Sequence, residues 1–177
     1  TTRSLVSTGA QIHTQGSVRV DADNAVRALS LAASVRGAGG KAVGASFSSM
    51  VSAGTTEAFI DGLVRAGGDM TLTADTGVLF AQAVGQFGAA AGIGAGGSLA
   101  LTVMNNETRA AIRSAGTVDV AGSSLIEADA DEDTYQVSVS GVVGGGTVGV
   151  AGSLALGVHT STTEAYVAGP LNADAGF

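Results

Sequence analysis

The phrase TTEAFI at residues 55–60 decides the fold, because the chain carries it in four versions. The others are TTRSLV (1–6), ETRAAI (107–112) and TTEAYV (162–167), so successive copies lie 54, 52 and 55 residues apart. A phrase that returns at such a period is typical of proteins built from stacked units, in which each unit buries its hydrophobic face against the next. The chain is therefore predicted to be a repeat protein.

Two further phrases keep the same period, and three independent phrases at one period make the repeat a strong signal. The first reads ASFSS at 45–49 and GSLAL at 97–101 and 152–156. The second reads VDAD at 20–23, LTAD at 72–75 and IEAD at 126–129. We predict one repeat array over 1–177, with a partial unit at 1–15 and units at roughly 16–67, 68–122 and 123–177. We expect it to be an excerpt of a longer protein.

Apolar and polar residues alternate through most of each unit, which predicts β-strands. In the repeated phrase, Thr108, Ala110 and Ile112 fall on one face of a strand and Arg109 on the other. Gly-rich stretches separate the strands, and the apolar residues do not recur at helical spacing. The predicted fold is all-β: an elongated β-solenoid, most simply a parallel β-helix. An antiparallel sandwich or prism built from the longer strand pairs is the alternative.

The alternation also predicts which side chains face the core of the repeat. They are Val18, Val20, Ile60, Met70, Leu72, Leu99, Leu101, Val103, Ile112, Leu154, Leu156 and Val158. The opposite face of the repeated phrase carries Arg3, Glu57, Arg109 and Glu164 in successive copies. If one repeat makes one coil, these four side chains form a ladder of alternating charge, worth a few tenths of a kcal/mol per pair. If a repeat makes several coils, the charges are too far apart to interact.

Composition excludes several classes of function. The net charge of −7 argues against partners that need basic patches, namely nucleic acids and anionic membranes. The absence of cysteine excludes disulfides and thiolate metal sites. The Gly-rich run at 84–103 is a poor candidate for a membrane helix, so we expect no membrane insertion by this segment.

Few residues have the spacing of a catalytic or metal site. Asp129, Asp131 and Asp133 follow the spacing that opens an EF-hand loop, but the Gly and the distal Glu of that loop are missing. We interpret them as a solvated acidic corner and as a weak Ca²⁺ candidate. His13 and His159 lie at different phases of the repeat, which predicts that they do not meet. We therefore predict no catalytic residue, no metal and no cofactor.

The repeats resemble those of giant filamentous adhesins of Gram-negative bacteria, the filamentous-haemagglutinin-like and leukotoxin-type proteins. The resemblance covers essentially the whole chain and is carried by TTEAFIDGLVRAGGDMTLTAD (55–75), GASFSSMVSAGTTEAFI (44–60) and VGVAGSLALGVHTSTTEAYV (148–167). It implies a secreted, cell-surface β-helical shaft, not an enzyme, that serves adhesion by projecting a binding region. Its partners would be neighbouring repeats of the parent chain and a host-cell protein or glycan. The acidic ADADED (128–133) departs from the other units.

Two other functions remain open on the sequence. One is a binding module that contacts a glycan or a host protein directly through an exposed strand face. The other is a β-helix enzyme that acts on polysaccharide, which would need carboxylates or basic residues converging in one groove.

Overall fold

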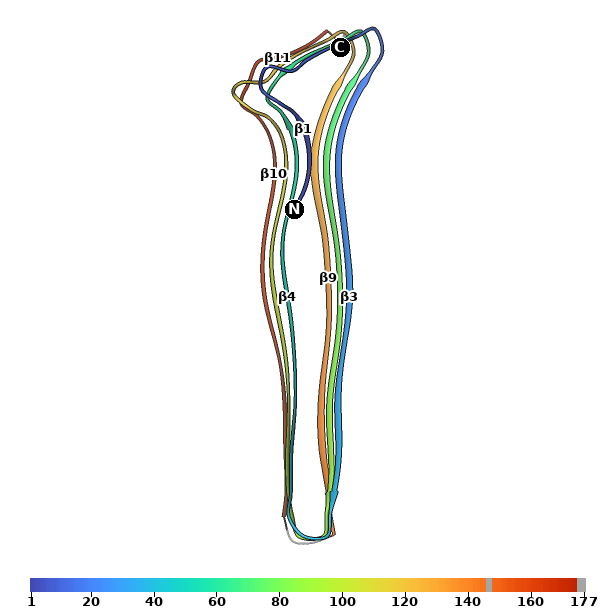
Figure 1. Cartoon of the computed structure of the whole chain (residues 1–177), viewed down its shortest axis with the longest axis vertical. Helices are drawn as coiled ribbons and strands as arrows, with labels where there is room; N and C mark the ends of the chain where they lie inside the picture. The colour runs from blue at the N-terminus through green and yellow to red at the C-terminus, as the bar shows by residue number, and fades with distance from the viewer. Residues whose placement is uncertain (146–147, 175–177) are drawn as a thin grey trace.

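The computed structural model describes residues 1–145 and 148–174, and all the regular secondary structure in these residues is β-strand (Figure 1). These residues form eleven strands, three to each complete coil, one in each sheet. They are β1 (Thr2–Val6), β2 (Gln11–Thr14), β3 (Val18–Ala38), β4 (Ala42–Ile60), β5 (Leu63–Ala66), β6 (Met70–Ala90), β7 (Ile93–Ile112), β8 (Thr117–Val120), β9 (Ser124–Gly144), β10 (Val148–Val167) and β11 (Leu171–Ala173).

The strands form three parallel sheets. Sheet A has the order β1-β4-β7-β10, sheet B the order β2-β5-β8-β11, and sheet C the order β3-β6-β9. Corresponding strands of successive repeats pair in register, so that the phrase at 55–60 lies beside the phrase at 107–112. One repeat is therefore one coil of a parallel β-solenoid. The predicted β-solenoid is confirmed, and the antiparallel alternative does not apply.

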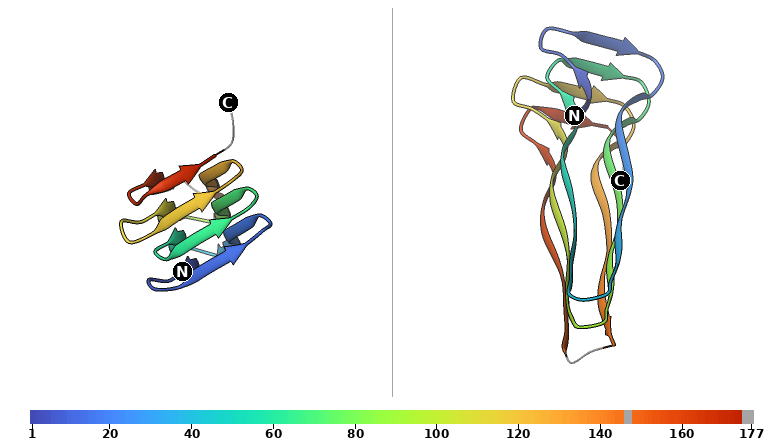
Figure 2. Two further views of the ribbon diagram at one scale, coloured as in Figure 1. Left: turned by 90° about the horizontal axis from the view of Figure 1, so that it is seen from above. Right: turned by 60° about the horizontal axis from the view of Figure 1, so that its bottom comes forward.

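Each coil has a wide end and a long narrow extension (Figure 1). We call the wide end, where the short strands of sheet B lie, the head: residues 1–23, 57–75, 109–129 and 164–174. The facing long strands of sheets A and C form the blade, residues 24–56, 76–108, 130–145 and 148–163. A strand of 21 residues such as β6 is about 70 Å long. Figure 2 shows the coils stacked in chain order.

The head holds the main hydrophobic core, and here the predicted inward residues are buried. Ile60, Leu72 and Ile112 are fully enclosed, and Val20 is buried beside them. Met70 is also buried, and Val18 is partly buried at the margin. The inward placement of Ala58, Ala110 and Thr108 is likewise confirmed, since all three are buried.

In the blade, the prediction of the inward face is wrong. The predicted core residues of β7 and β10 lie on the outer face of sheet A, while Ser98, Ala100 and Thr102 between them are buried. The outward residues are Leu99, Leu101, Val103, Leu154, Leu156 and Val158. The reason is strand parity: β7 runs without a break to Ile112, which must face the head core, so odd-numbered residues of β7 face outward.

Glycine at one corner of each coil allows the coils to stack closely. A Cβ atom on Gly116 would lie 2.2 Å from the carbonyl oxygen of Ile60 in the preceding coil. A Cβ on Gly169 would lie 2.2 Å from the carbonyl oxygen of Gly116. Because real side chains do not approach backbone this closely, only glycine fits where one coil crosses another.

Candidate functional site

The charged row predicted on the repeated phrase exists, and its residues are register partners. Arg3 pairs with Glu57, and the Nε of Arg109 lies 3.0 Å from a carboxylate oxygen of Glu164. Arg109 also contacts Glu107 of its own strand. Among the described residues, no ion pair joins Glu57 to Arg109, although their strands are adjacent. Of the three contacts between neighbouring coils in this row, two are therefore ion pairs that stabilise the stacking of the coils.

A second row, on the outer face of sheet C, is acidic. Asp23, Asp75 and Asp129 are register partners on adjacent strands. Desolvation, and after it repulsion from the neighbouring aspartates, raises the pKa of Asp75 above its ordinary value of 3.8. One row nearer the head, a hydrogen bond from the Thr73 hydroxyl and then one from Arg19 lower the pKa of Asp21. Burial and the neighbouring like charges therefore disfavour the ionised form of Asp75.

The weak Ca²⁺ candidate lies in the strand β9, and not at a corner as predicted. Asp129, Asp131 and Asp133 point outward from alternate positions of this straight strand. Alternate residues of a strand are about 6.6 Å apart, and the carboxylates project in parallel, so they do not converge on one ion. Within the described ranges, no group of three or more His, Asp or Glu side chains is arranged to hold a metal. Glu132 points inward and accepts a hydrogen bond of 2.7 Å from Asn106.

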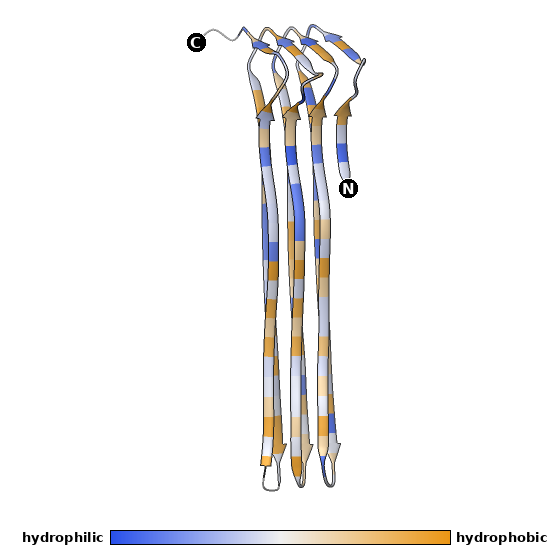
Figure 3. Cartoon of the chain, turned by 90° about the vertical axis from the view of Figure 1, so that its left-hand side faces the viewer, coloured by the Kyte–Doolittle hydropathy of each residue, from blue (hydrophilic) through white to orange (hydrophobic). Residues whose placement is uncertain are grey.

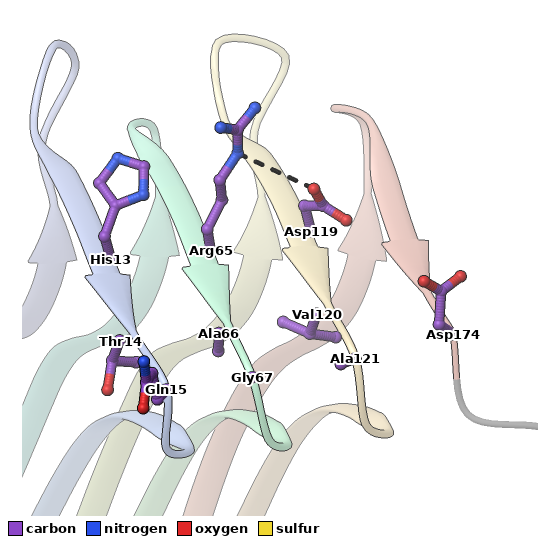
Figure 4. A pocket seen from close by; sticks show the side chains of 10 residues that line it. All are labelled: His13, Thr14, Gln15, Arg65, Ala66, Gly67, Asp119, Val120, Ala121 and Asp174. Atoms are coloured by element: carbon purple, nitrogen blue, oxygen red, sulfur yellow. Dashed lines mark ion pairs between the residues drawn. The ribbon is translucent and has the colours of Figure 1, made fainter.

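A groove in the head lies on the outer face of sheet B and has a volume of about 470 Å³ (Figure 4). Equivalent positions of successive coils carry His13, Arg65, Asp119 and Asn172. Arg65 lies 3.8 Å from Asp119, which also accepts a hydrogen bond of 3.1 Å from Asn172. The residue type at this position differs in every coil, and Arg65 pairs with Asp119. The groove therefore does not present the same binding group from coil to coil.

The remaining ionisable candidates are dispersed. His13 lies on β2 in the first coil, whereas His159 lies on β10 in the last coil, so the two histidines do not share a coil, as predicted. Lys41 lies immediately before β4 at the tip of the blade. The described residues contain no helix that is both long and apolar enough to cross a membrane.

The interior of the blade is polar, which the sequence reasoning missed. The Gln82 amide donates to the Ser48 hydroxyl over 2.8 Å, and its oxygen accepts from Thr102. Gln136 of the next coil donates to Thr102 and to Gln82. Nearer the head, Met50, Val78, Phe80 and Met104 form a small apolar cluster inside the blade. Strand parity, counted from Ile112, was the signal that could have placed these polar residues inside.

Gln86 departs from this pattern of satisfied polar groups. It is 1% exposed, and neither its amide nitrogen nor its oxygen has a hydrogen-bond partner in the described part of the chain. Its side chain crosses from sheet C to the backbone of sheet A at Gly44 and Gly96. The two glycines provide the space that the amide occupies.

The outer faces of the blade carry the large apolar side chains that the narrow interior cannot hold. Phe47 is 59% exposed and Leu154 is 52% exposed. Charged residues of sheet A gather near the head end of its long strands, where Figure 3 shows the blue bands. Away from the head, the outer face of sheet A is thus largely apolar, while the interior of the blade contains buried hydroxyl and amide groups.

These features define a class of protein: a parallel β-solenoid with one coil per repeat, whose surface consists of side-chain rows that run across the coils. Searches against protein-family models, curated proteins and solved structures each found no match to the chain.

Proposed function

We propose that this chain is a shaft segment of a secreted bacterial surface adhesin, which holds a binding region at a distance from the cell. The observation that carries the proposal is that strands of every sheet pair in register with their counterparts in the next coil. Such a stack grows by one strand spacing, about 4.8 Å, for each repeat added. Its stability is close to a sum of coil terms and coil–coil interfaces, which suits an element that varies in length.

The arrangement of ionisable groups supports a structural role over an enzyme. Five of the seven arginines pair with carboxylates of the same or a neighbouring coil, as Arg113 does with Asp61 over 3.2 Å. Arg113 also lies over the ring of Phe59, 3.3 Å from its centroid. Polysaccharide chemistry would need an acid and a base that converge on one groove. The resemblance in repeat style is what supports a bacterial surface location, with host protein or glycan as the eventual partner.

A binding measurement on the chain itself tests the proposal. The 177-residue chain, labelled at its N-terminus, is titrated onto host epithelial cells and onto a glycan array, beside the parent protein. A shaft segment gives no saturable binding, while the parent protein binds. Saturable binding by the segment alone contradicts the shaft and supports the binding module. A second readout is the length of the parent protein by small-angle scattering, which should fall by about 4.8 Å per repeat deleted.

A further inference from the structure

The outer face of sheet A in the blade is apolar over a long continuous area. We define the A face as the outward side chains of 43–51, 95–103 and 150–158, which the pairing of β4, β7 and β10 places in shared rows. Ser49 is its only polar side chain, and no residue of it is charged. An exposed apolar area of this kind marks an interaction surface, because single exposed apolar residues are ordinary but contiguous ones are not.

The A face has a relief made of one row of small residues beside one row of large residues. The small row forms the floor of a groove of about 550 Å³, and the large row forms its wall. The rows are two residues apart along the strands, which is about 6.6 Å. The small row is Ala45, Gly97 and Gly152, and the large row is Phe47, Leu99 and Leu154.

We propose that the A face binds the A face of a second copy of this chain, in a two-fold pair with antiparallel strands. A two-fold axis that passes between the two rows sets the large row of each copy into the groove of the other. Contacts in such an interface are reciprocal, so a ridge and a groove side by side on one surface are self-complementary. Stacked sheets pack about 10 Å apart, a distance that these side chains fill. The inference does not rest on the proposed function.

Sheet C does not offer the same relief. Its outward residues are also apolar toward the tip, but each row mixes large and small side chains. Leu31 and Val137 flank Ala83, and Phe87 lies between Val35 and Gly141. No continuous ridge forms, so a second copy would leave gaps against sheet C.

The size of the A face predicts a weak pair. The axis between the two rows superposes only the stretch 43–49 and its register partners, so three strands about 4.8 Å apart project about 330 Å² per copy, or roughly 670 Å² in the pair. Specific interfaces begin at about 1,000 Å² in total, so a pair of three-coil chains falls below that size and is weak. Each added coil contributes about 110 Å² per copy, and a longer array pairs more tightly.

Lipid is the competing occupant of an apolar face. The net charge of −7 disfavours contact with anionic membranes, which leaves neutral lipid as the alternative that a flotation measurement must separate from a second copy.

Sedimentation equilibrium of the 177-residue chain tests the pairing, from about 10 μM to 1 mM. The mass is expected to rise from 17.0 kDa towards twice that value. Leu154→Lys should raise the midpoint concentration at least about tenfold, because a charge would enter the apolar contact. Val137→Lys is the matched control, since Val137 is 55% exposed on the edge strand of sheet C. It should change the midpoint less than about twofold, and both variants should keep the wild-type circular dichroism.

Three results would overturn the proposal. The first is a constant monomer mass up to 1 mM. The second is a greater effect of Val137→Lys than of Leu154→Lys, which would assign the contact to sheet C. The third is growth beyond the dimer, because a closed two-fold pair cannot extend. Flotation with neutral phosphatidylcholine vesicles separates the lipid alternative: a monomeric chain that floats, and that Leu154→Lys releases, assigns the face to lipid.

Discussion

Gly96→Ala tests the contact between Gln86 and the backbone of sheet A. A Cβ on Gly96 would lie 1.8 Å from the Gln86 side-chain oxygen and 2.7 Å from its carbonyl carbon, Cδ. On its other side the amide already lies close to the backbone of Gly44, where an added Cβ would fall 2.4 Å from the amide nitrogen, so the buried side chain has little room to move. In the Gly96→Ala variant, either the Gln86 side chain or the strand β7 must therefore shift.

The expected cost combines two opposing effects. Overpacking of a filled interior costs about 1–3 kcal/mol. Replacing glycine with alanine returns about 0.4–1 kcal/mol by restricting the unfolded chain. The net loss is about 1–2 kcal/mol, which lowers the melting temperature by roughly 2–8 °C in a chain of this length. Thermal and urea unfolding followed by circular dichroism measure both quantities.

Two controls make the prediction specific to Gln86. Gly97→Ala places a methyl group on the outer face, where its nearest neighbour is the Gly152 carbonyl oxygen at 3.6 Å, so stability should be unchanged or slightly higher. In a Gln86→Ala background, Gly96→Ala should no longer be destabilising. The reasoning is refuted if Gly96→Ala is as stable as the wild type, or if Gly97→Ala loses as much.

Three further predictions concern the faces and rows. Leu101→Asp should leave the melting temperature within about 2 °C, whereas Ala100→Asp next to it buries a charge and should cost more than about 3 kcal/mol; equal losses would contradict the assignment of faces. Asp75→Asn should raise the melting temperature at pH 7. The raised pKa of Asp75 means that the folded chain holds the proton more tightly, so its contribution favours folding at low pH and is lost as pH rises through that pKa. The gain should therefore vanish below about pH 3.8, and a gain that persists there would show that burial and repulsion of the ionised Asp75 carboxylate are not its cause. Arg113→Ala removes the contact with Phe59 and one ion pair, and should cost about 1–2 kcal/mol in urea unfolding; an unchanged midpoint would show that the stack is not stabilising.

The period of the chain predicted most of the fold. Three phrases at one spacing indicated stacked units, and the alternation at Thr108, Ala110 and Ile112 indicated one buried strand face. The row that contains Glu57 and Arg109 followed from the same alignment of repeats. These features depend on pairing between identical positions, which a sequence displays directly.

The inward face of the blade could not be read from hydrophobicity. Leu101 was assigned to the core because it is large and apolar, yet it lies outside, and Ala100 and Thr102 lie inside. Two long sheets that pack closely leave room for small side chains, and buried hydroxyls and amides are tolerated because they bond to one another. Counting alternate residues back from the buried Ile112 gives the inward face of β7 correctly, but only if the strand is known to continue without a bulge.

Candidate functional chemistry was harder to predict than the fold. The aspartates of β9 matched a loop spacing, but a straight strand separates them and points them in parallel. The self-complementary relief of the A face depends on which residues share a row. The alignment of the repeats already predicted this register. It indicated no surface relief, however, until the structure placed Leu99 and Gly97 on the outer face.

The central claim, that one repeat makes one coil, is tested most directly by joining two coils with a disulfide. The chain has no cysteine, so Glu57→Cys together with Arg109→Cys introduces a single pair of thiols at register partners. Neighbouring strands place such Cα atoms about 4.8 Å apart, within the range that a disulfide spans. Mild oxidation should remove both free thiols in the monomer and leave the circular dichroism unchanged. Two free thiols in a folded, oxidised monomer would contradict the claim.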